Sequence, residues 1–318
     1  MKLSILTGII QVSRDFDGLR DLREVLQVLH DVGYDTVDVG FVEPDHPDFI
    51  FRGDDWEKKI EALGNTAAKL GMTIAQSHLP TPKGACFELD PNWKKSGYPA
   101  YFDQCMERAY LASGMLGVPY GTVHPLTYLD TMTEPWETME RNHRYYDRFV
   151  ELGIRCHVGT AIENMRPDSP KWPFPARYCQ NYRELIELVD SFHDPMVGIC
   201  WDTGHANHSQ CNQVEALRAI GGRLKNLHIN DNHYGMRDEH LLPFMGTVDW
   251  DHVIPVLAEI GYQGVLNYEV GKVARSAPRE LQVEILKTVY ANGNQLLRIY
   301  QQAKERQDAG AAVVERGD

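Results

Sequence analysis

Six side chains that can bind a metal ion follow successive apolar, strand-like segments of the sequence. In chain order they are His78, His124, Glu163, Asp202, His228 and Glu269. An imidazole or carboxylate buried at the end of an apolar strand costs free energy unless it has a partner. Six of them at the same end of consecutive strands therefore indicate one shared functional site.

Four of these residues form an oxygen-rich ligand set with a single nitrogen, namely Glu163, Asp202, His228 and Glu269. Such a set suits one divalent cation, and we expect Mn²⁺ before Mg²⁺, Co²⁺ or Zn²⁺. The cation would polarise a substrate carbonyl as a Lewis acid. Glu163 and Glu269, from opposite sides of the strand ring, could remove and return a proton beside that carbonyl. This chemistry predicts a sugar or sugar phosphate isomerase or epimerase that works through a metal-stabilised enediolate.

Five further polar residues are predicted to contact the substrate: His78, His124, His205, Asp238 and His240. Asp202 and His205 lie three residues apart at the start of an expected helix, which places both on one face. Each residue taken singly also has a structural explanation; Asp202, for example, could simply be a helix N-cap. The agreement of ligand type, strand position and order favours a site.

Strand-like and helix-like segments alternate along the whole chain. The predicted strands are Leu3–Gly8, Thr36–Phe41, Thr73–His78, Gly121–His124, Arg155–Glu163, Val197–Asp202, Leu224–Asn230 and Gly264–Val270. The predicted helices are Leu19–His30, Trp56–Leu70, Tyr101–Leu116, Trp136–Leu152, Tyr182–Phe192, Gln213–Ile220, Trp250–Ile260 and Pro278–Gln301. Eight such units without a linker predict an α/β fold with a single (β/α)8 TIM barrel over residues 1–302. Residues 303–318 are expected to be a frayed C-terminal extension.

Glycines mark many of the predicted helix ends, as in Val32-Gly33 and Leu152-Gly153. Two long loops, 79–99 and 164–181, leave the carboxyl ends of strands and should overhang the active-site face. The second loop is rich in proline and aromatic residues, which suits either a pocket wall or a contact between subunits. A doubly wound open sheet is the alternative fold, but the sequence has no GxGxxG phosphate turn.

The bulk composition limits the possible partners. The chain has 318 residues, of which 45 are acidic and 32 basic, giving a formal net charge of −13. This balance argues against a nucleic-acid partner, which needs clustered Lys and Arg. Six cysteines without CxxC spacing suggest neither disulfides nor a thiolate zinc site, so we expect a cytoplasmic protein. No apolar run is long enough for a membrane span, and the first ten residues fit a strand better than a signal peptide.

Several motifs together resemble the xylose isomerase-like barrel superfamily. They are SHLP, VHPL, IENM, WDTGHAN, LHINDN, GTVDW and NYEV, in that order, and the resemblance runs from about Leu3 to Gly271. It implies a sugar-converting enzyme with a small-molecule carbohydrate substrate. In the ketose 3-epimerases of this group a Glu, Asp, His, Glu set binds one metal ion and the two glutamates move the proton. The resemblance assigns those roles to Glu163, Asp202, His228 and Glu269.

The same resemblance leaves other activities open. A lyase could use the same site, either as an inosose-type dehydratase or as the barrel subunit of an enzyme that cleaves C-glycosides of 3-keto sugars. That subunit would pair with a small β-rich partner, whereas a homo-oligomer is the default expectation. An endonuclease IV-type nuclease with three zinc ions also fits the ligand types, but the acidic charge opposes it. No phosphate-binding loop is present; Lys225, Arg237, Lys272 and Arg275 could contact a phosphate or be ordinary surface charges.

Overall fold

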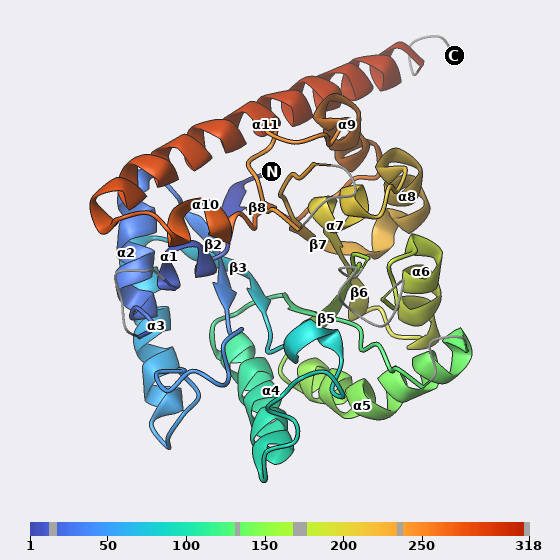
Figure 1. Cartoon of the computed structure of the whole chain (residues 1–318). Coiled ribbons are helices and arrows are strands. Elements are labelled where there is room, and N and C mark those ends of the chain that lie inside the picture. Colours follow the sequence, from blue (N-terminus) through green and yellow to red (C-terminus); the bar gives the residue numbers. More distant parts are fainter. Residues whose placement is uncertain (13–17, 131–133, 168–176, 234–237, 315–318) are drawn as a thin grey trace.

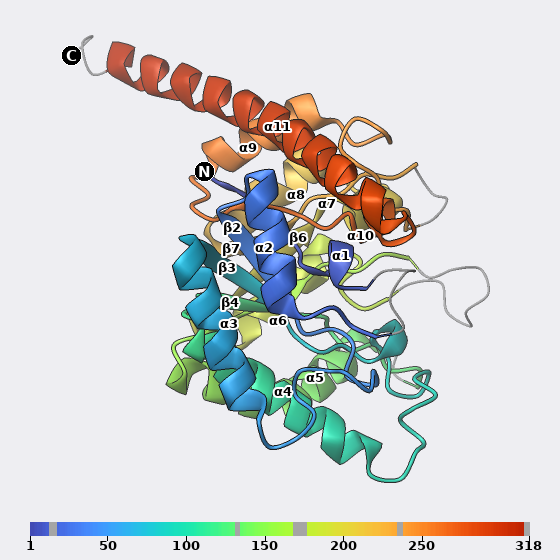
Figure 2. The ribbon, with the colours of Figure 1, turned by 90° about the vertical axis from the view of Figure 1, so that its left-hand side faces the viewer.

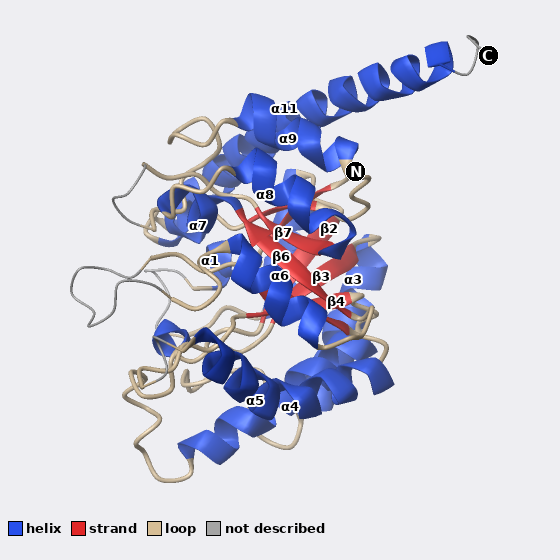
Figure 3. Cartoon of the chain, turned by 90° about the vertical axis from the view of Figure 1, so that its right-hand side faces the viewer, coloured by secondary structure: helices blue, strands red, loops and turns tan. Residues whose placement is uncertain are grey.

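The computed structural model describes residues 1–12, 18–130, 134–167, 177–233 and 238–314. Its eight strands are all parallel to their neighbours and lie at the centre of the molecule (Figure 3). They are β1 (Leu3–Ile5), β2 (Thr36–Gly40), β3 (Thr73–His78), β4 (Tyr120–Val123), β5 (Gly159–Glu163), β6 (Val197–Asp202), β7 (Leu224–His228) and β8 (Leu266–Tyr268). The predicted α/β class is therefore confirmed, and each of the eight predicted strands has a counterpart, although β1 and β5 are shorter than predicted.

The strands form two sheets rather than one uninterrupted ring. Strands β2 to β7 make a six-stranded sheet in chain order, and β1 pairs with β8 in a second sheet. Isolated parallel bridges join the sheets at both seams, between Leu6 and Asp38 and between Ile229 and Tyr268. The carboxyl ends of all the strands still meet at one face, which is the arrangement that builds a shared site.

Helices surround the strands in the ring seen in Figure 1. The longer ones are α2 (Leu22–Val32), α3 (Trp56–Leu70), α4 (Tyr98–Met115), α5 (Pro135–Arg155), α6 (Tyr182–Ser191), α8 (Gln213–Ile220), α9 (Trp250–Glu259) and α11 (Arg279–Val314). Short segments follow several strands: α1 (Gly8–Gln11), α7 (Thr203–His208) and α10 (Gly271–Arg275), with single 3-10 turns at Lys83–Ala85 and Gly221–Arg223. Helix cover on the outside explains why β2, β5 and β6 are buried along their whole length.

The boundary predicted at Leu152-Gly153 is wrong, because α5 continues to Arg155 and β5 begins only at Gly159. Gly153 serves close packing instead of ending the helix. A Cβ atom there would lie 2.6 Å from the carbonyl oxygen of Val158 and 2.8 Å from the Tyr110 ring. The left-handed residue after the helix is His157, with φ of 60°.

The last helix also differs from the prediction. Helix α11 does not fray near Ala303 but continues to Val314, and in Figures 1 and 2 its C-terminal part extends beyond the strands. Residues Lys304 to Ala309 are exposed, so this part of the helix has little packing within the chain. Its alanine-rich sequence favours helix through intrinsic propensity. In the described part of the chain, no helix is both long and apolar enough to cross a membrane.

Candidate metal and proton-transfer site

The four predicted metal ligands converge at the carboxyl ends of neighbouring strands. Glu163, Asp202 and His228 are the last residues of β5, β6 and β7, and Glu269 directly follows β8. Asp202 and His228 are paired in the β6–β7 register. One ligand atom from each of the four residues lies within 4.8 Å of the others. We call these four residues the quartet.

His228 is at the centre of the quartet. Its Nδ1 atom lies 3.0 Å from Oε1 of Glu163 and 2.9 Å from Oε2 of Glu269. Glu163, Asp202 and His228 are fully buried, whereas the Glu269 side chain is 18% exposed and lines a cavity. Glu269 is thus the member of the quartet that a substrate in this cavity meets directly.

His78 and His124 contact the other side of Glu163. Their Nε2 atoms lie 3.6 Å and 2.9 Å from Oε2 of this carboxylate, respectively. Together the three residues make a second set with metal-binding geometry, which shares Glu163 with the quartet. The structure therefore brings both histidines to the site, where they could contact either substrate or a cation.

Asp202 is both the N-cap of helix α7 and a member of the quartet. Its Oδ1 caps α7 by accepting a 2.6 Å hydrogen bond from the His205 backbone N–H. Its Oδ2 accepts a 2.8 Å hydrogen bond from the Asn230 side chain. The His205 ring, predicted to meet substrate, lies 2.9 Å from the Asn164 carbonyl and 3.5 Å from Glu163.

Asp238 and His240 form a pair beside the quartet. His240 Nε2 lies 3.0 Å from Asp238 Oδ1, and its Nδ1 donates to the backbone carbonyl of Glu269 at 2.7 Å. Arg166 lies 3.2 Å from the same aspartate. Among the described residues, the sets with metal-binding geometry include none of Asp238, His240 and His205.

Three supporting residues were not predicted: Asp38, Asn230 and Arg166. Asp38 lies inside β2, where Gln76 and Asn267 each donate to its Oδ2 at 2.9 Å. The same oxygen is 3.5 Å from Nε2 of His228, so Asp38 orients the ring from below, as partners of ligating histidines commonly do. An acidic residue within the apolar run Thr36–Gly40 was the sequence feature that could have revealed it.

The electrostatics of the quartet fit a cation. Burial raises the pKa of Asp202 well above its usual range, and the carboxylates of Glu163 and Glu269 raise it further. Burial opposes ionisation of Glu269 too, but His228 lowers its pKa to about 2. Burial disfavours the charged His228 ring, yet nearby Cys200, Glu163 and Glu269 raise its pKa well above the usual value. The quartet contains three carboxylates, and a protonated His228 would compensate only one of their negative charges. A divalent cation would compensate two.

The surroundings of the Glu163 carboxylate support the same conclusion. This carboxylate is fully buried, and its neighbours in the described part of the chain include the rings of His78, His124 and His228. Burial of a carboxylate is costly, and imidazole rings or a metal ion are partners that offset this cost. The donor set of the quartet, three carboxylates and one imidazole, therefore fits a hard or borderline divalent cation.

Two cavities lie near the carboxyl ends of the strands. A cavity of about 270 Å³, which we call the small pocket, is lined by residues from the site and by the first and last strand–helix loops. The site residues in its lining are His78, His124, His240 and Glu269. Its volume is just below the range typical of drug-sized ligands, which suits a monosaccharide.

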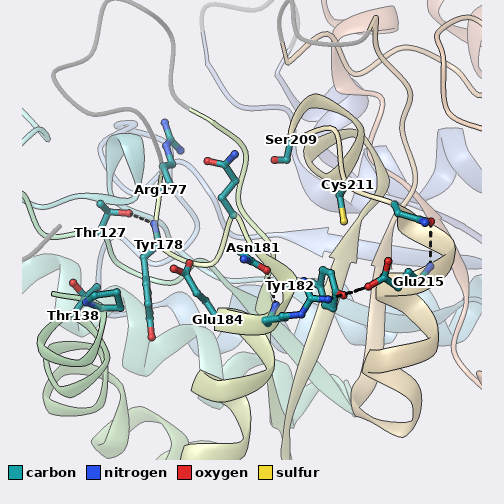
Figure 4. Close-up of a pocket in the computed structure, with 14 residues that line it drawn as sticks. Thr127, Thr138, Arg177, Tyr178, Asn181, Tyr182, Glu184, Ser209, Cys211 and Glu215 are labelled. Atoms are coloured by element: carbon teal, nitrogen blue, oxygen red, sulfur yellow. Dashed lines mark hydrogen bonds and ion pairs between the residues drawn. The ribbon is translucent and has the colours of Figure 1, made fainter. Parts of the chain in front are cut away.

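A larger cavity of about 550 Å³ lies to one side and contains no quartet residue (Figure 4). Arg177, Tyr178 and Asn181, from the described end of the long loop after β5, contribute to its wall. Figure 4 shows Tyr182 bonded to Glu215 across it, at 2.6 Å. The sequence suggested that this loop forms a pocket wall, and its described end does so, in the larger cavity and not in the small pocket. Residues 168–176 of the loop lie outside the described residues.

Gly204 should be required for the geometry of Asp202. A Cβ atom at Gly204 would lie 1.7 Å from Oδ1 of Asn230, the residue that bonds to Asp202. We expect Gly204→Ala to displace Asn230 and weaken metal binding about 10- to 100-fold, the usual effect of losing an outer partner of a ligand. Titration of the purified variant with Mn²⁺ by calorimetry measures this. Gly222→Ala, with open space around its Cβ, is the matched control, and equal Mn²⁺ affinity in both variants would contradict the assignment.

The fold and the convergent carboxylates and histidines define a class of barrel enzyme with a metal-competent site. A family model described as xylose isomerase-like TIM barrel matches residues 26–288. The chain belongs to this family, as its motifs indicated.

Curated relatives cover only part of the chain. An uncharacterized protein, y4fM of Sinorhizobium fredii, is 37% identical over 162 residues, which is 48% of this chain and 49% of that protein. A D-psicose 3-epimerase of Ruminiclostridium cellulolyticum is 24% identical over 211 residues, 65% of each chain. An inosose dehydratase of Clostridium botulinum is 24% identical over 139 residues, or 39% of this chain and 41% of that enzyme. The chain thus spans about half the length of the first of these relatives.

Solved structures match over nearly the whole chain. A D-tagatose 3-epimerase-like protein superposes with a TM-score of 0.69 at 21% identity, covering 95% of this chain and 99% of the other. A structure of the protein IOLI with a bound zinc atom gives a TM-score of 0.68 at 16% identity, covering 95% and 99%. At these identities the superpositions establish a shared fold.

Proposed function

We propose that this protein is a divalent-metal-dependent sugar epimerase or isomerase. The observation that carries the proposal is the quartet, in which Glu163 and Glu269 approach a common imidazole from separate strands. The relationship to a D-psicose 3-epimerase supports the reaction class. Glu163, Asp202, His228 and Glu269 would hold the cation, which when bound supplies Lewis-acid polarisation of a substrate carbonyl.

Side chains of the protein would transfer the proton and hold the substrate. Glu269 lines the small pocket and its side chain is partly accessible there, so its carboxylate is placed to take a proton from the carbon beside the carbonyl. Glu163, which contacts the same nitrogen of His228, would enter the step protonated and deliver its proton to the opposite face of that carbon, which inverts it, while Glu269 keeps the abstracted proton until it exchanges with solvent. His78, His124 and His240 line the small pocket and can hold the substrate oxygens by hydrogen bonds.

Solvent-label uptake tests this proposal. We expect the Mn²⁺-loaded protein to incorporate deuterium from ²H₂O into one carbon adjacent to the carbonyl of a ketose, followed by NMR across a panel of ketoses. The recovery of an epimer or aldose at the same rate identifies the product. No uptake into any ketose would contradict the reaction class.

A lyase is the second candidate, and the inosose dehydratase relative favours it. Dehydration starts with the same proton abstraction but then loses a neighbouring hydroxyl group, which a protonated histidine of the small pocket could assist. The same NMR spectra separate the two reactions, because the lyase gives an unsaturated or deoxy product instead of an epimer.

The number of metal ions per chain is a separate prediction. Because the His78–His124–Glu163 set shares its carboxylate with the quartet, we expect one tightly bound ion per chain, held by the quartet. Elemental analysis of the wild type and of His124→Gln should give the same stoichiometry. A second ion that disappears in His124→Gln would instead show that both sets bind metal, and three zinc ions would favour a nuclease.

A further inference from the structure

Two cations lie at the end of the small pocket formed by helix α10. Lys272 and Arg275 are three residues apart on this helix, which places them on the same face. Both line the cavity that also contains Glu269 and the histidines of the site. Helix α10 begins two residues after Glu269, so the proposed base and these cations occupy adjacent parts of one short segment.

Basic side chains outnumber carboxylates in the ion pairs that Asp238 makes. Asp238 contacts Arg166 at 3.2 Å, His240 at 3.0 Å and Lys272 at 3.7 Å, so one carboxylate faces three basic side chains. Arg275 is exposed and has no hydrogen-bond or ion-pair partner within the described part of the chain. In a protein with a net charge of −13, an unpaired arginine directed at a catalytic cavity is unexpected for a merely solvated surface.

We propose that Arg275, assisted by Lys272, binds an anionic group at the end of the substrate remote from the reacting carbonyl. This inference rests on the proposed function and adds the substrate class: an acidic sugar, whose anion is a phosphate or a carboxylate. A guanidinium group can donate two parallel hydrogen bonds to either anion, and a lysine adds a compact charge. The quartet and the α10 cations then hold the two ends of one substrate, which fixes the carbon that faces Glu269.

Lys225, another cation considered for phosphate contact, does not add to this site. Lys225 lies near the beginning of β7, away from the catalytic end of that strand, and donates to the Gly222 carbonyl at 3.0 Å. Arg237 lies outside the described residues.

Three ligands that differ only at carbon 6 test the inference: D-fructose, D-fructose 6-phosphate and D-fructuronate. Their affinities for the Mn²⁺-loaded wild type, Arg275→Gln, Lys272→Gln and the control Arg298→Gln are measured by calorimetry at low and high salt. Arg298 is an exposed arginine of α11 that, among the described residues, donates to the neighbouring glutamine Gln295 at 3.0 Å. We expect at least one anionic ligand to bind about 10- to 100-fold more tightly than D-fructose, as a charge-assisted contact would give. Arg275→Gln should remove most of this preference, Lys272→Gln part of it, and Arg298→Gln none.

Each outcome distinguishes the inference from the proposed function. Tighter binding of only the phosphate or only the carboxylate supports the inference and identifies the anion. Equal affinities for all three ligands, or a preference that persists in Arg275→Gln, would overturn it. Deuterium uptake into D-fructose without any anion preference would leave the epimerase proposal standing and remove the inference. An Arg275-dependent anion preference without deuterium uptake into any of the three would support anion binding while arguing against the proposed reaction.

Discussion

Replacing either glutamate of the quartet by glutamine should reduce deuterium uptake by at least about 10³-fold, the usual contribution of a positioned acid or base. Glutamine keeps the size of the side chain but can neither accept a proton nor supply a negative charge. The effect should be present in Glu163→Gln and in Glu269→Gln, because each change removes both a proposed ligand of the cation and one of the two groups proposed to move the proton. The measurement is the rate of label uptake by NMR at saturating ketose and Mn²⁺.

A matched control separates this effect from a general loss of structure. Glu184 is also partly buried, but it lines the larger cavity and accepts a hydrogen bond from the Cys179 backbone. Glu184→Gln retains that acceptor and should exchange label like the wild type. Elemental analysis of all three variants shows whether activity is lost with the metal or despite it. Wild-type exchange in either quartet variant would disprove the assigned roles.

Asp202→Asn should abolish metal-dependent stabilisation without unfolding the protein. Asparagine caps helices about as well as aspartate, so the bond from the His205 backbone survives while the charge is lost. In the wild type, Mn²⁺ at about 100 times its dissociation constant should add about 2.7 kcal/mol to the free energy of unfolding. In Asp202→Asn this increment should fall close to zero. Thermal unfolding monitored by circular dichroism with Mn²⁺ and with EDTA measures both values.

The metal-free variants provide a second test of the same charge cluster. Removing one of three buried carboxylates relieves repulsion, so Asp202→Asn in EDTA should be at least as stable as the wild type in EDTA. Asp249→Asn is the control, because Asp249 is exposed at the start of α9 and its ion pair in the described part of the chain is with His252, which is not a member of the quartet. That variant should retain the full Mn²⁺ response. A full response in Asp202→Asn would exclude Asp202 from the metal site.

The sequence predicted the convergence of the site because barrel geometry does most of the positioning. Once residues are assigned to the carboxyl ends of parallel strands, the register brings them to one rim. Asp202 and His228, which are 26 positions apart in the chain, become direct partners in this way. The carboxyl ends of the strands could be predicted from the sequence because a carboxylate or imidazole side chain follows each apolar run.

Other features depend on contacts that no local pattern specifies. Asp38 supports His228 from an adjacent part of the barrel interior, and this contact depends on how β2 and β7 face each other in space. Gly153 resembles a helix end in the sequence, but its real constraint is the approach of Tyr110 and Val158. The end of α11 was misjudged because helix propensity can extend a helix beyond its last packed turn.

The position of α10 has a consequence for how this protein could evolve or be engineered. The residues proposed to move the proton lie at the carboxyl ends of strands. Lys272 and Arg275 instead belong to a five-residue helix that follows the last strand. Under the proposed anion contact, single-codon changes in that helix should alter which substrate binds while the residues proposed to move the proton stay unchanged. A library limited to Gly271–Arg275 would test this separation directly.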